Sequence, residues 1–213
     1  MTTTDGTVAL QDTRERLLAA ACSRFAAHGF RGVGVRDICA DAKANVAAVS
    51  YHFGSKEGLY LEALRHAFAV LHTPLPGLAE GSDALQALEE WIQARVVRSL
   101  APSQPRWPAQ LLWRELLDPT EAMDALVREV MAPMLKEFQK LLRTLAPSLT
   151  DKESMLWSFT ILGQIVLHDF ARTPVLALMG AGEYTEERMA QIAAHLTDVV
   201  VRGLGIGRTR RER

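Results

Sequence analysis

The sequence contains few cysteines and no recognisable export signal. Cys22 and Cys39 are the only two in 213 residues, and no apolar run follows a basic start. A disulfide framework and secretion are therefore not expected, and we expect a cytoplasmic protein. Both cysteines stand at apolar helical positions, which favours buried thiols over a redox sensor.

Long apolar runs are also missing. The longest, "MLWSFTILGQIVL" over residues 155–167, is interrupted by Ser158, Thr160 and Gln164. A run of this length is too short to cross a bilayer as a helix. It predicts a buried helix, and no membrane partner is expected.

The chain lacks an excess of basic residues. The net charge is −1; residues 1–60 carry seven Lys/Arg against six Asp/Glu, residues 61–207 carry 13 against 18, and residues 208–213 carry four against one. A protein that coats nucleic acid would carry a strongly basic field. The distribution leaves room for a small, local contact with nucleic acid in the N-terminal part.

The residue patterns of an enzyme are not found either. There is no Gly-rich phosphate loop and no nucleophile motif. His168 and Asp169 form the best acid-base pair, but adjacent helical residues point away from each other. The histidines show no metal-ligand spacing with carboxylates or cysteines; they are His28, His52, His66, His72, His168 and His195. No catalytic residue, metal site or cofactor is predicted.

Helix signals, in contrast, run through nearly the whole chain, and strand signals are absent. The predicted fold class is therefore all-α. "DTRE" predicts a first helix with Asp12 as its N-cap and Glu15 completing a capping box. "TPLPG" ends the fourth helix near His72 and marks a domain boundary.

The C-terminal part predicts longer helices. Ser82 is a candidate N-cap, and "DPTE" predicts Asp118 as the N-cap of a helix that runs to Leu145 and bends near Pro133. Thr150 opens the helix over residues 152–170 with a capping box. The last helix is predicted over residues 185–203 from its apolar spacing.

Two adjacent short helices joined by a tight turn match a helix-turn-helix. The first begins near Val35 in "GVRDICADA", and the second, "VAAVSYHF", is capped by Asn45. A helix that enters the DNA major groove needs an outer face without long apolar side chains, and Ala47 and Ala48 provide one. Tyr51 and His52 can then reach phosphate oxygens. Lys56, at the start of the next helix, adds a positive charge beside free N–H groups.

The alternative is that "VSYHF" is only a helix end that packs its aromatic side chains. Phe53 is assigned to the core in either case. For Tyr51, His52 and Lys56 the phosphate-contact hypothesis is preferred, because all three follow the small-residue face directly in sequence.

The stretch from Thr13 to Leu64 resembles the DNA-binding domain of TetR-family transcriptional regulators. "TRERLLAAACSRFAAHGFRGVGVRDICADAKANVAAVSYHFGSKEGLYLEAL" carries the pattern, and "NVAAVSYHF" is similar to a subgroup whose recognition helix opens with asparagine. The resemblance implies a double-stranded DNA operator as partner. It implies DNA contacts at ten positions, which are Arg36, Lys43, Asn45, Val46, Ala47, Ala48, Ser50, Tyr51, His52 and Lys56.

Three positions depart from the family pattern. Gly34 stands where a threonine usually precedes the second helix, Ser50 stands where a tyrosine is common, and Lys43 replaces a usual glycine in the turn. These changes bear on the target sequence rather than on the presence of the motif.

The resemblance also implies a domain organisation. It consists of a disordered tail (1–11), a helix-turn-helix domain (12–55), a connecting helix (56–72), a ligand-binding and dimerisation domain (73–204) and a basic disordered tail (205–213). A homodimer through the helices at about 152–170 and 185–203 is expected, with a pseudo-palindromic operator. The implied function is a repressor that a mostly apolar small molecule releases from DNA. The alternatives are an activator, and an all-α ligand-binding protein with degenerate DNA recognition.

A ligand pocket is expected in the C-terminal part. Thr160, Gln164 and His168 recur every four residues and share one helix face, where they line either a pocket or the dimer interface. Each tryptophan is either a pocket wall or plain core. The candidate pocket residues are Trp91, Arg95, Trp113, Arg114, Met123, Trp157, Thr160, Gln164 and His168.

Overall fold

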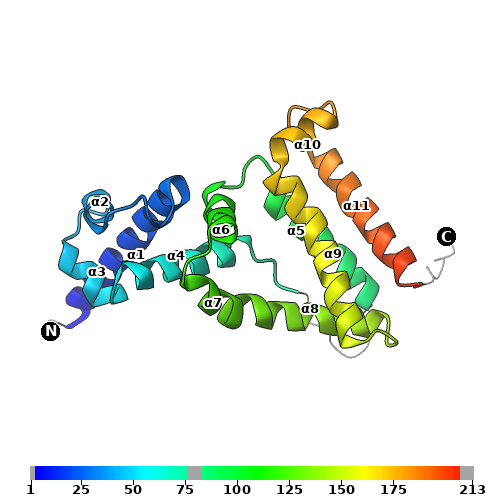
Figure 1. Ribbon diagram of the computed structural model, residues 1–213, viewed down its shortest axis with the longest axis horizontal. Helices are drawn as coiled ribbons and strands as arrows, with labels where there is room; N and C mark the ends of the chain where they lie inside the picture. The colour runs from blue at the N-terminus through cyan, green and yellow to red at the C-terminus, as the bar shows by residue number, and fades with distance from the viewer. Residues whose placement is uncertain (1–2, 76–82, 207–213) are drawn as a thin grey trace. The chain divides into compact units, whose positions relative to one another are not determined.

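A computed structural model describes residues 3–75 and 83–206 of the chain (Figure 1). Throughout those residues the regular structure is helical and no strand occurs. The predicted all-α class is confirmed.

The chain divides into two compact units. The N-terminal unit comprises Met1–Leu71 and Pro105–Met131, and the C-terminal unit comprises His72–Gln104 and Ala132–Arg213. Residues 105–131 lie inside the predicted C-terminal domain, but in the structure they group with the N-terminal helices.

The N-terminal unit holds α1 (Thr3–His28), α2 (Val35–Asp41), α3 (Val46–Phe53), α4 (Lys56–Leu71), α6 (Trp107–Leu117), α7 (Ala122–Leu126) and the π-helical turn η1 (Val127–Met131). The C-terminal unit holds α5 (Ala84–Leu100), α8 (Ala132–Leu145), α9 (Asp151–Phe170), α10 (Arg172–Leu178) and α11 (Glu186–Gly203).

The N-terminal unit is built around α1, α4 and α6. Figure 1 shows α6 close to α1 and α4, and these three helices pack against one another. Phe25 and Tyr60 meet edge to face with ring centroids 4.8 Å apart. The core contains, among others, Leu17, Phe25, Ile38, Val49, Leu59, Tyr60, Leu64 and Leu111. α6 thereby extends the core on which the helix-turn-helix rests.

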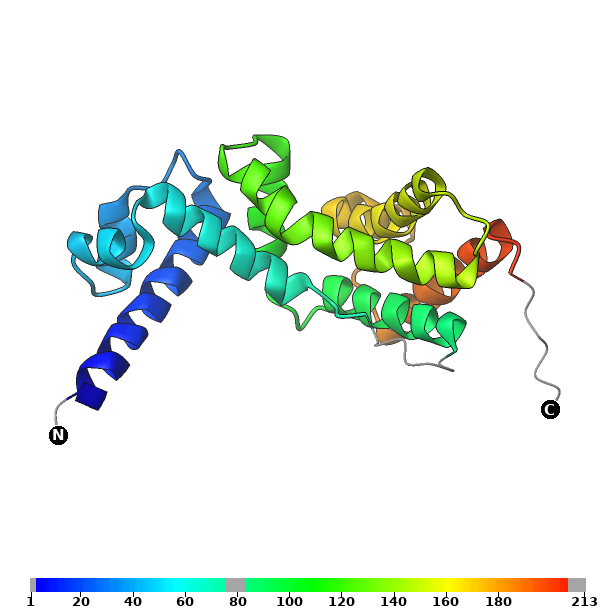
Figure 2. The same ribbon diagram turned by 90° about the horizontal axis from the view of Figure 1, so that it is seen from below.

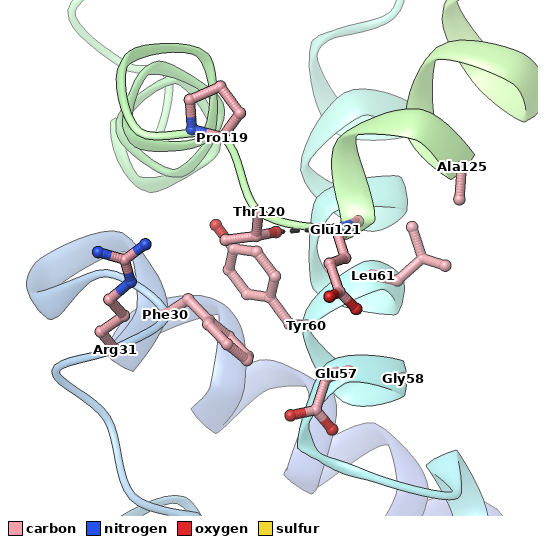
Figure 3. A pocket seen from close by; sticks show the side chains of 11 residues that line it. Phe30, Arg31, Glu57, Gly58, Tyr60, Leu61, Pro119, Thr120, Glu121 and Ala125 are labelled. Carbon is pink, nitrogen blue, oxygen red and sulfur yellow. Dashed lines mark hydrogen bonds between the residues drawn. The ribbon is translucent and has the colours of Figure 1, made fainter.

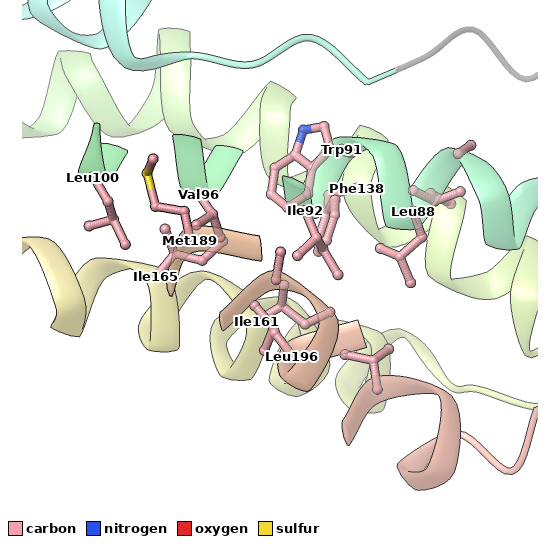
Figure 4. Close-up of a cluster of buried hydrophobic side chains, with 14 of the residues drawn as sticks. Leu88, Trp91, Ile92, Val96, Leu100, Phe138, Ile161, Ile165, Met189 and Leu196 are labelled. Carbon is pink, nitrogen blue, oxygen red and sulfur yellow. The ribbon is translucent and has the colours of Figure 1, made fainter. Parts of the chain in front are cut away.

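The C-terminal unit has its own apolar core. Trp91 of α5 packs on Phe138 of α8 with ring centroids 4.5 Å apart, and Figure 2 shows α5 running along α8. Figure 4 shows side chains of α5, α9 and α11 meeting in this core, including Ile92, Ile161 and Leu196. Burying each such side chain contributes roughly 1.5–3 kcal/mol.

Several helix starts follow the predicted caps. Asn45 Oδ1 accepts from the Ala48 amide at 2.8 Å, and Thr150 and Glu153 form a reciprocal capping box at α9. At the predicted start of the last helix, Thr185 accepts from the Arg188 amide and caps α11, although it is not among the predicted caps. Ser82, the predicted cap of α5, lies outside the described residues; Asp83 caps that helix by accepting from two amides.

Two predicted helix starts are wrong. α1 begins at Thr3, so residues 3–11 continue the helix upstream of Asp12 instead of forming a disordered tail. Asp118 does not cap a helix; its amide donates to the Arg114 carbonyl and closes α6, and α7 begins only at Ala122. Bonds from Thr120 back to Glu115, five residues earlier, hold the intervening loop, and the capping pattern does not reveal them.

The helix that contains Pro133 is irregular on its N-terminal side. The π-helical turn η1 directly precedes α8, so the run from α7 to α8 is continuous but changes its hydrogen-bond spacing. Proline lacks an amide donor, and π turns absorb such local defects. The bend near Pro133 stays a prediction, and the structure shows a change from η1 to α8 just before this proline. The end of the predicted basic tail, residues 207–213, lies outside the described residues.

No single described helix is long and apolar enough to cross a membrane. α9 and α10 meet the length and hydropathy requirement only as a pair, which is bent by 88°.

Candidate nucleic-acid interface

α2 is held to α1 by a two-pronged ion pair. Arg24 Nε and Nη2 donate to the Asp41 carboxylate at 2.6 and 2.8 Å. This pairing holds the pKa of Asp41 below its usual range. Gly34 offers no capping side chain, but its amide donates to Asp37 Oδ2 at 3.2 Å. The start of α2 is thus ordered by Asp37 without the threonine that the family pattern places there.

The turn between α2 and α3 contains a strained residue. Lys43 has a φ of 50°, in the left-handed region. A residue with a Cβ in this region costs about 1–2 kcal/mol, whereas glycine does not. This conformation explains why the family pattern has glycine in the turn. Lys43 is exposed here, so its ammonium group is accessible beside α3.

α3 has one buried side and one open side. Val49 is 2% exposed and anchors the helix in the N-terminal core. On the open side Ala47 and Ser50 are exposed and small, and Val46 is 48% exposed. The DNA major groove is about 12 Å wide and admits a helix with such a face. Arg36 on α2 is exposed as well.

The three aromatic residues at the end of α3 differ in their exposure to solvent. Tyr51 is 73% exposed, while His52 and Phe53 are half-buried. Phe53 packs against the N-terminal core and lies 5.1 Å below the Arg14 guanidinium. Tyr51 can therefore offer its hydroxyl to a phosphate without disturbing the core.

The start of α4 is tightly built. Ser55 Oγ accepts from the Gly58 amide at 3.2 Å, and Lys56 Nζ lies 4.4 Å from the centre of the Phe30 ring. A Cβ added at Gly58 would lie 2.1 Å from the Phe53 carbonyl oxygen, so glycine alone fits. This close approach fixes Lys56 next to the end of α3.

α6 ties the end of α1 into the same unit. Arg114 Nε and Nη2 donate to the carbonyl oxygens of Ala26 and Ala27, both at 2.7 Å. These carbonyls belong to the last turn of α1, where a cation also complements the helix dipole. Arg114, a predicted pocket residue, thus holds two helices of this unit together.

A buried carboxylate on α6 organises the loop to α7. Glu115 is 1% exposed. It accepts from the Tyr60 hydroxyl at 2.9 Å, the Thr120 amide at 2.9 Å and the Thr120 hydroxyl at 3.0 Å. Burial and this carboxylate raise the pKa of Tyr60. A single acid in the apolar stretch "WPAQLLWRELL" was the available sequence signal for it.

The nine predicted pocket residues are divided between the two units. Trp113, Arg114 and Met123 belong to the N-terminal unit, and the other six belong to the C-terminal unit. A cavity of about 590 Å³ lies in the N-terminal unit, and none of the nine lines it. An adjoining cavity of about 250 Å³ includes Arg114.

Within the C-terminal unit, Trp91 and Trp157 serve in packing. The Trp91 indole donates to the Thr73 carbonyl at 2.9 Å. Trp157 fills the space over Gly203, where an added Cβ would lie 2.2 Å from its ring. Arg95 donates to Ser99 Oγ at 2.6 Å, and burial lowers the pKa of Arg95 to about 10. Arg95 is therefore a charged side chain that the C-terminal unit partly removes from water.

The three polar residues predicted to share one face of α9 differ in their burial. Thr160 and Gln164 are exposed, and the Thr160 hydroxyl donates to the Leu156 carbonyl within its own helix. His168 is half-buried, with Nδ1 3.1 Å from the Tyr184 hydroxyl. Burial lowers the pKa of His168. Thr160 and Gln164 thus share the open side of α9 with exposed apolar residues.

Family models match both parts of the chain. The model described as "Bacterial regulatory proteins, tetR family" matches residues 17–63. The model described as "HTH-type transcriptional dual regulator CecR, C-terminal domain" matches residues 84–206, more than half of the chain.

Similar whole chains are known. The HTH-type transcriptional dual regulator CecR of Shigella flexneri is 24% identical, with 93% of this chain and 95% of the relative covered. The crystal structure of a transcriptional regulator from Rhodococcus sp. Rha1 has a TM-score of 0.66 at 19% identity, covering 89% of this chain and 96% of that one. AibR, solved with isovaleryl coenzyme A and operator DNA, has a TM-score of 0.64 at 13% identity, covering 88% and 97%. At these identities the two structures show a common fold alone.

Proposed function

Because the chain belongs to the TetR family of bacterial regulatory proteins, with a C-terminal domain of the CecR type, we propose that it is a homodimeric repressor. In this proposal it belongs to the "NVAAVSYHF" subgroup, and a mostly apolar small molecule releases it from a palindromic operator. The protein is a transcriptional regulator. Its dimerisation, its effector and the sign of its regulation are the proposed parts.

The geometry of α3 carries the DNA-binding part of the proposal. Its open side presents small residues at Ala47 and Ser50, and it ends at Tyr51, with Lys56 fixed beside it by the packing of Gly58. Small side chains let the helix enter the groove, and the flanking hydroxyl and ammonium groups can bind phosphates on its edge.

Selection from genomic fragments tests this part. Fragments of the source genome captured by the purified protein and sequenced are expected to share one pseudo-palindromic site. Its half-sites should lie about one helical turn apart, because two recognition helices of a dimer read successive major grooves about 34–36 Å apart. Recovery of fragments without any shared sequence would contradict the proposal.

An open apolar face on α9 supports dimerisation. Five side chains on this helix are 42–55% exposed; they are Met155, Leu156, Phe159, Leu167 and Phe170. α11 packs beside α9 and exposes Val199 together with the small residues Ala190 and Ala194. Contiguous apolar surface of this kind marks a protein interface. We assign α9 and α11 to the contact with a second copy of the chain.

Charge placed on that face should prevent assembly. Leu156→Glu with Phe159→Glu is expected to reduce the mass in solution from twice the chain mass of 23.5 kDa to a single chain at micromolar concentration. An unpaired carboxylate in a buried interface is strongly unfavourable. Sedimentation or light scattering measures the change, with Lys140→Glu on the exposed surface of α8 as control. If the double variant remained a dimer, the contact would lie elsewhere.

The effector is assigned to the C-terminal unit. Its aromatic and apolar content suits a mostly apolar molecule, and Arg95, which donates to Ser99 Oγ, is a partly desolvated charge there. AibR, of similar fold, was solved with isovaleryl coenzyme A and operator DNA. Ligand binding can lower operator affinity only by its differential affinity for the DNA-bound and DNA-free conformations. Activation is the second candidate, because the CecR relative is described as a dual regulator.

A further inference from the structure

The cavity of about 590 Å³ in the N-terminal unit has no role in the proposed function. Its walls come from the end of α1, the first turns of α4 and the loop from α6 into α7 (Figure 3). The lining residues are Phe30, Arg31, Glu57, Gly58, Tyr60, Leu61, Pro119, Thr120, Glu121, Ala122 and Ala125. A volume of this size falls in the range of small-molecule sites, about 300–1,000 Å³.

The charges around the cavity favour a cation. Glu57 and Glu121 both line it, and Figure 3 shows the Glu121 carboxylate near Leu61 and the Tyr60 ring, with Glu57 at the start of α4. The one basic side chain in the lining, Arg31, lies 3.8 Å from the Asp118 carboxylate, which offsets its charge. With Lys56 at the Phe30 ring counted as well, the three carboxylates of Glu57, Glu121 and Asp118 exceed the two cations of Arg31 and Lys56 by one.

A further carboxylate lies behind the wall. Glu115 is buried and is held by neutral donors, the Tyr60 hydroxyl and the amide and hydroxyl of Thr120. Tyr60 and Thr120 both line the cavity. The hydrogen bonds to Glu115 hold Tyr60 and Thr120 in place at the wall of the cavity.

The apolar part of the lining is aromatic. The Phe30 and Tyr60 rings lie 4.9 Å apart and tilted by 45°. The ammonium of Lys56 lies 4.4 Å from the Phe30 ring centre, so this ring is already paired with a cation and the Tyr60 ring is left for a ligand. Leu61 and Ala125 complete an apolar surface beside the carboxylates.

From this combination we propose that the cavity is a binding site for a small organic cation that carries an apolar ring, that is, an arylalkylammonium compound. The ammonium group binds between Glu57 and Glu121, and the ring packs against Tyr60, Leu61 and Ala125. The site lies wholly in the N-terminal unit and is separate from the effector site assigned to the C-terminal unit.

Three probes of the same shape and different charge test the proposal. Benzylamine, benzyl alcohol and benzoate carry charges of +1, 0 and −1 near pH 7. Calorimetric titration of each into the full-length protein without DNA is expected to show benzylammonium binding at least about tenfold more tightly than benzyl alcohol, because charge-assisted hydrogen bonds are about twice as strong as neutral ones. Benzoate should not bind measurably. Equal binding of the charged and neutral probes, or preference for benzoate, would overturn the proposal.

Variants locate the site. Glu121 makes no capping bond at the start of α7, so Glu121→Gln should preserve the fold and weaken benzylammonium binding. Ala125→Leu narrows the cavity and should weaken benzylammonium and benzyl alcohol alike. Glu186→Gln, at the first position of α11, makes the same exchange in the C-terminal unit and serves as control. Loss of binding in Glu186→Gln, or undiminished binding in both cavity variants, contradicts this location. Since no DNA is present, failure of operator binding would leave these results unaffected.

Discussion

Replacing Tyr51 and Lys56 together by alanine is expected to weaken operator binding about 100-fold and to make its salt dependence shallower, by about one unit of the log–log slope for the lost lysine. Tyr51 is 73% exposed, so its removal deletes the proposed phosphate contact and almost no packing. Lys56 follows the end of α3, holds its ammonium 4.4 Å from the Phe30 ring centre, and is the second proposed phosphate contact. Fluorescence anisotropy on a selected operator measures the affinity over a salt series.

The controls separate contact from folding. Lys140→Ala removes the same charge from the exposed surface of α8, and it should leave operator affinity unchanged. Tyr51→Phe keeps the ring and removes only the hydroxyl. The free energy of unfolding should change by no more than about 1 kcal/mol in the double variant, the size of an exposed cation–π contact. A double variant that binds the operator like wild type would refute the assignment of both contacts.

Glu115→Ala is expected to destabilise the protein more than any surface change. It leaves the Tyr60 hydroxyl and the Thr120 amide without their acceptor and opens a void beneath the loop to α7. Unsatisfied buried donors cost about 1–3 kcal/mol each. A total loss of about 3 kcal/mol corresponds to a fall of about 10 °C in the melting temperature for a chain of this size.

Thermal unfolding followed by circular dichroism measures this loss. Glu89→Ala removes a carboxylate from the exposed side of α5 and should change the melting temperature by less than about 2 °C, since surface changes stay within about 0.5 kcal/mol. Glu115→Gln retains one acceptor oxygen and should fall between the two. If Glu115→Ala melted with wild type, the network would not stabilise the unit.

Several helix starts in both units have local signals in the sequence. Asn45, Thr150 and Thr185 cap their helices through bonds that span three residues, and asparagine and threonine are residue types that favour this position. The small open side of α3 is equally visible, because side-chain size can be read directly from the sequence. For the same reason the all-α class followed from periodicity alone.

The grouping of α6 and α7 with the N-terminal helices was not predictable in this way. It depends on Arg114 reaching the carbonyls of α1, 88 and 87 residues away, and on Glu115 meeting Tyr60, 55 residues away. "DPTE" has every local feature of a helix start, but the Thr120 amide is already bonded to Glu115. The long-range bonds of Arg114 and Tyr60, and this bond over five residues, override the local signal.

The candidate ligand residues were the hardest to place. The spacing of Thr160, Gln164 and His168 put them on one face of α9. It could not show that Thr160 and Gln164 are exposed whereas His168 is half-buried. Exposure depends on the elements packed against a helix. The cavity in the N-terminal unit, assembled from three segments far apart in sequence, left no local pattern at all.

The most direct test of the account is binding to a full operator and to the same fragment with one half-site scrambled, measured by anisotropy at about 150 mM salt. A dimer that reads two half-sites is expected to bind the full site at least about 100-fold more tightly, because each mismatched base pair costs about 1–3 kcal/mol. The Leu156→Glu, Phe159→Glu variant should lose that difference. Equal affinity of wild type for both fragments at every salt concentration would contradict sequence-specific reading by a dimer.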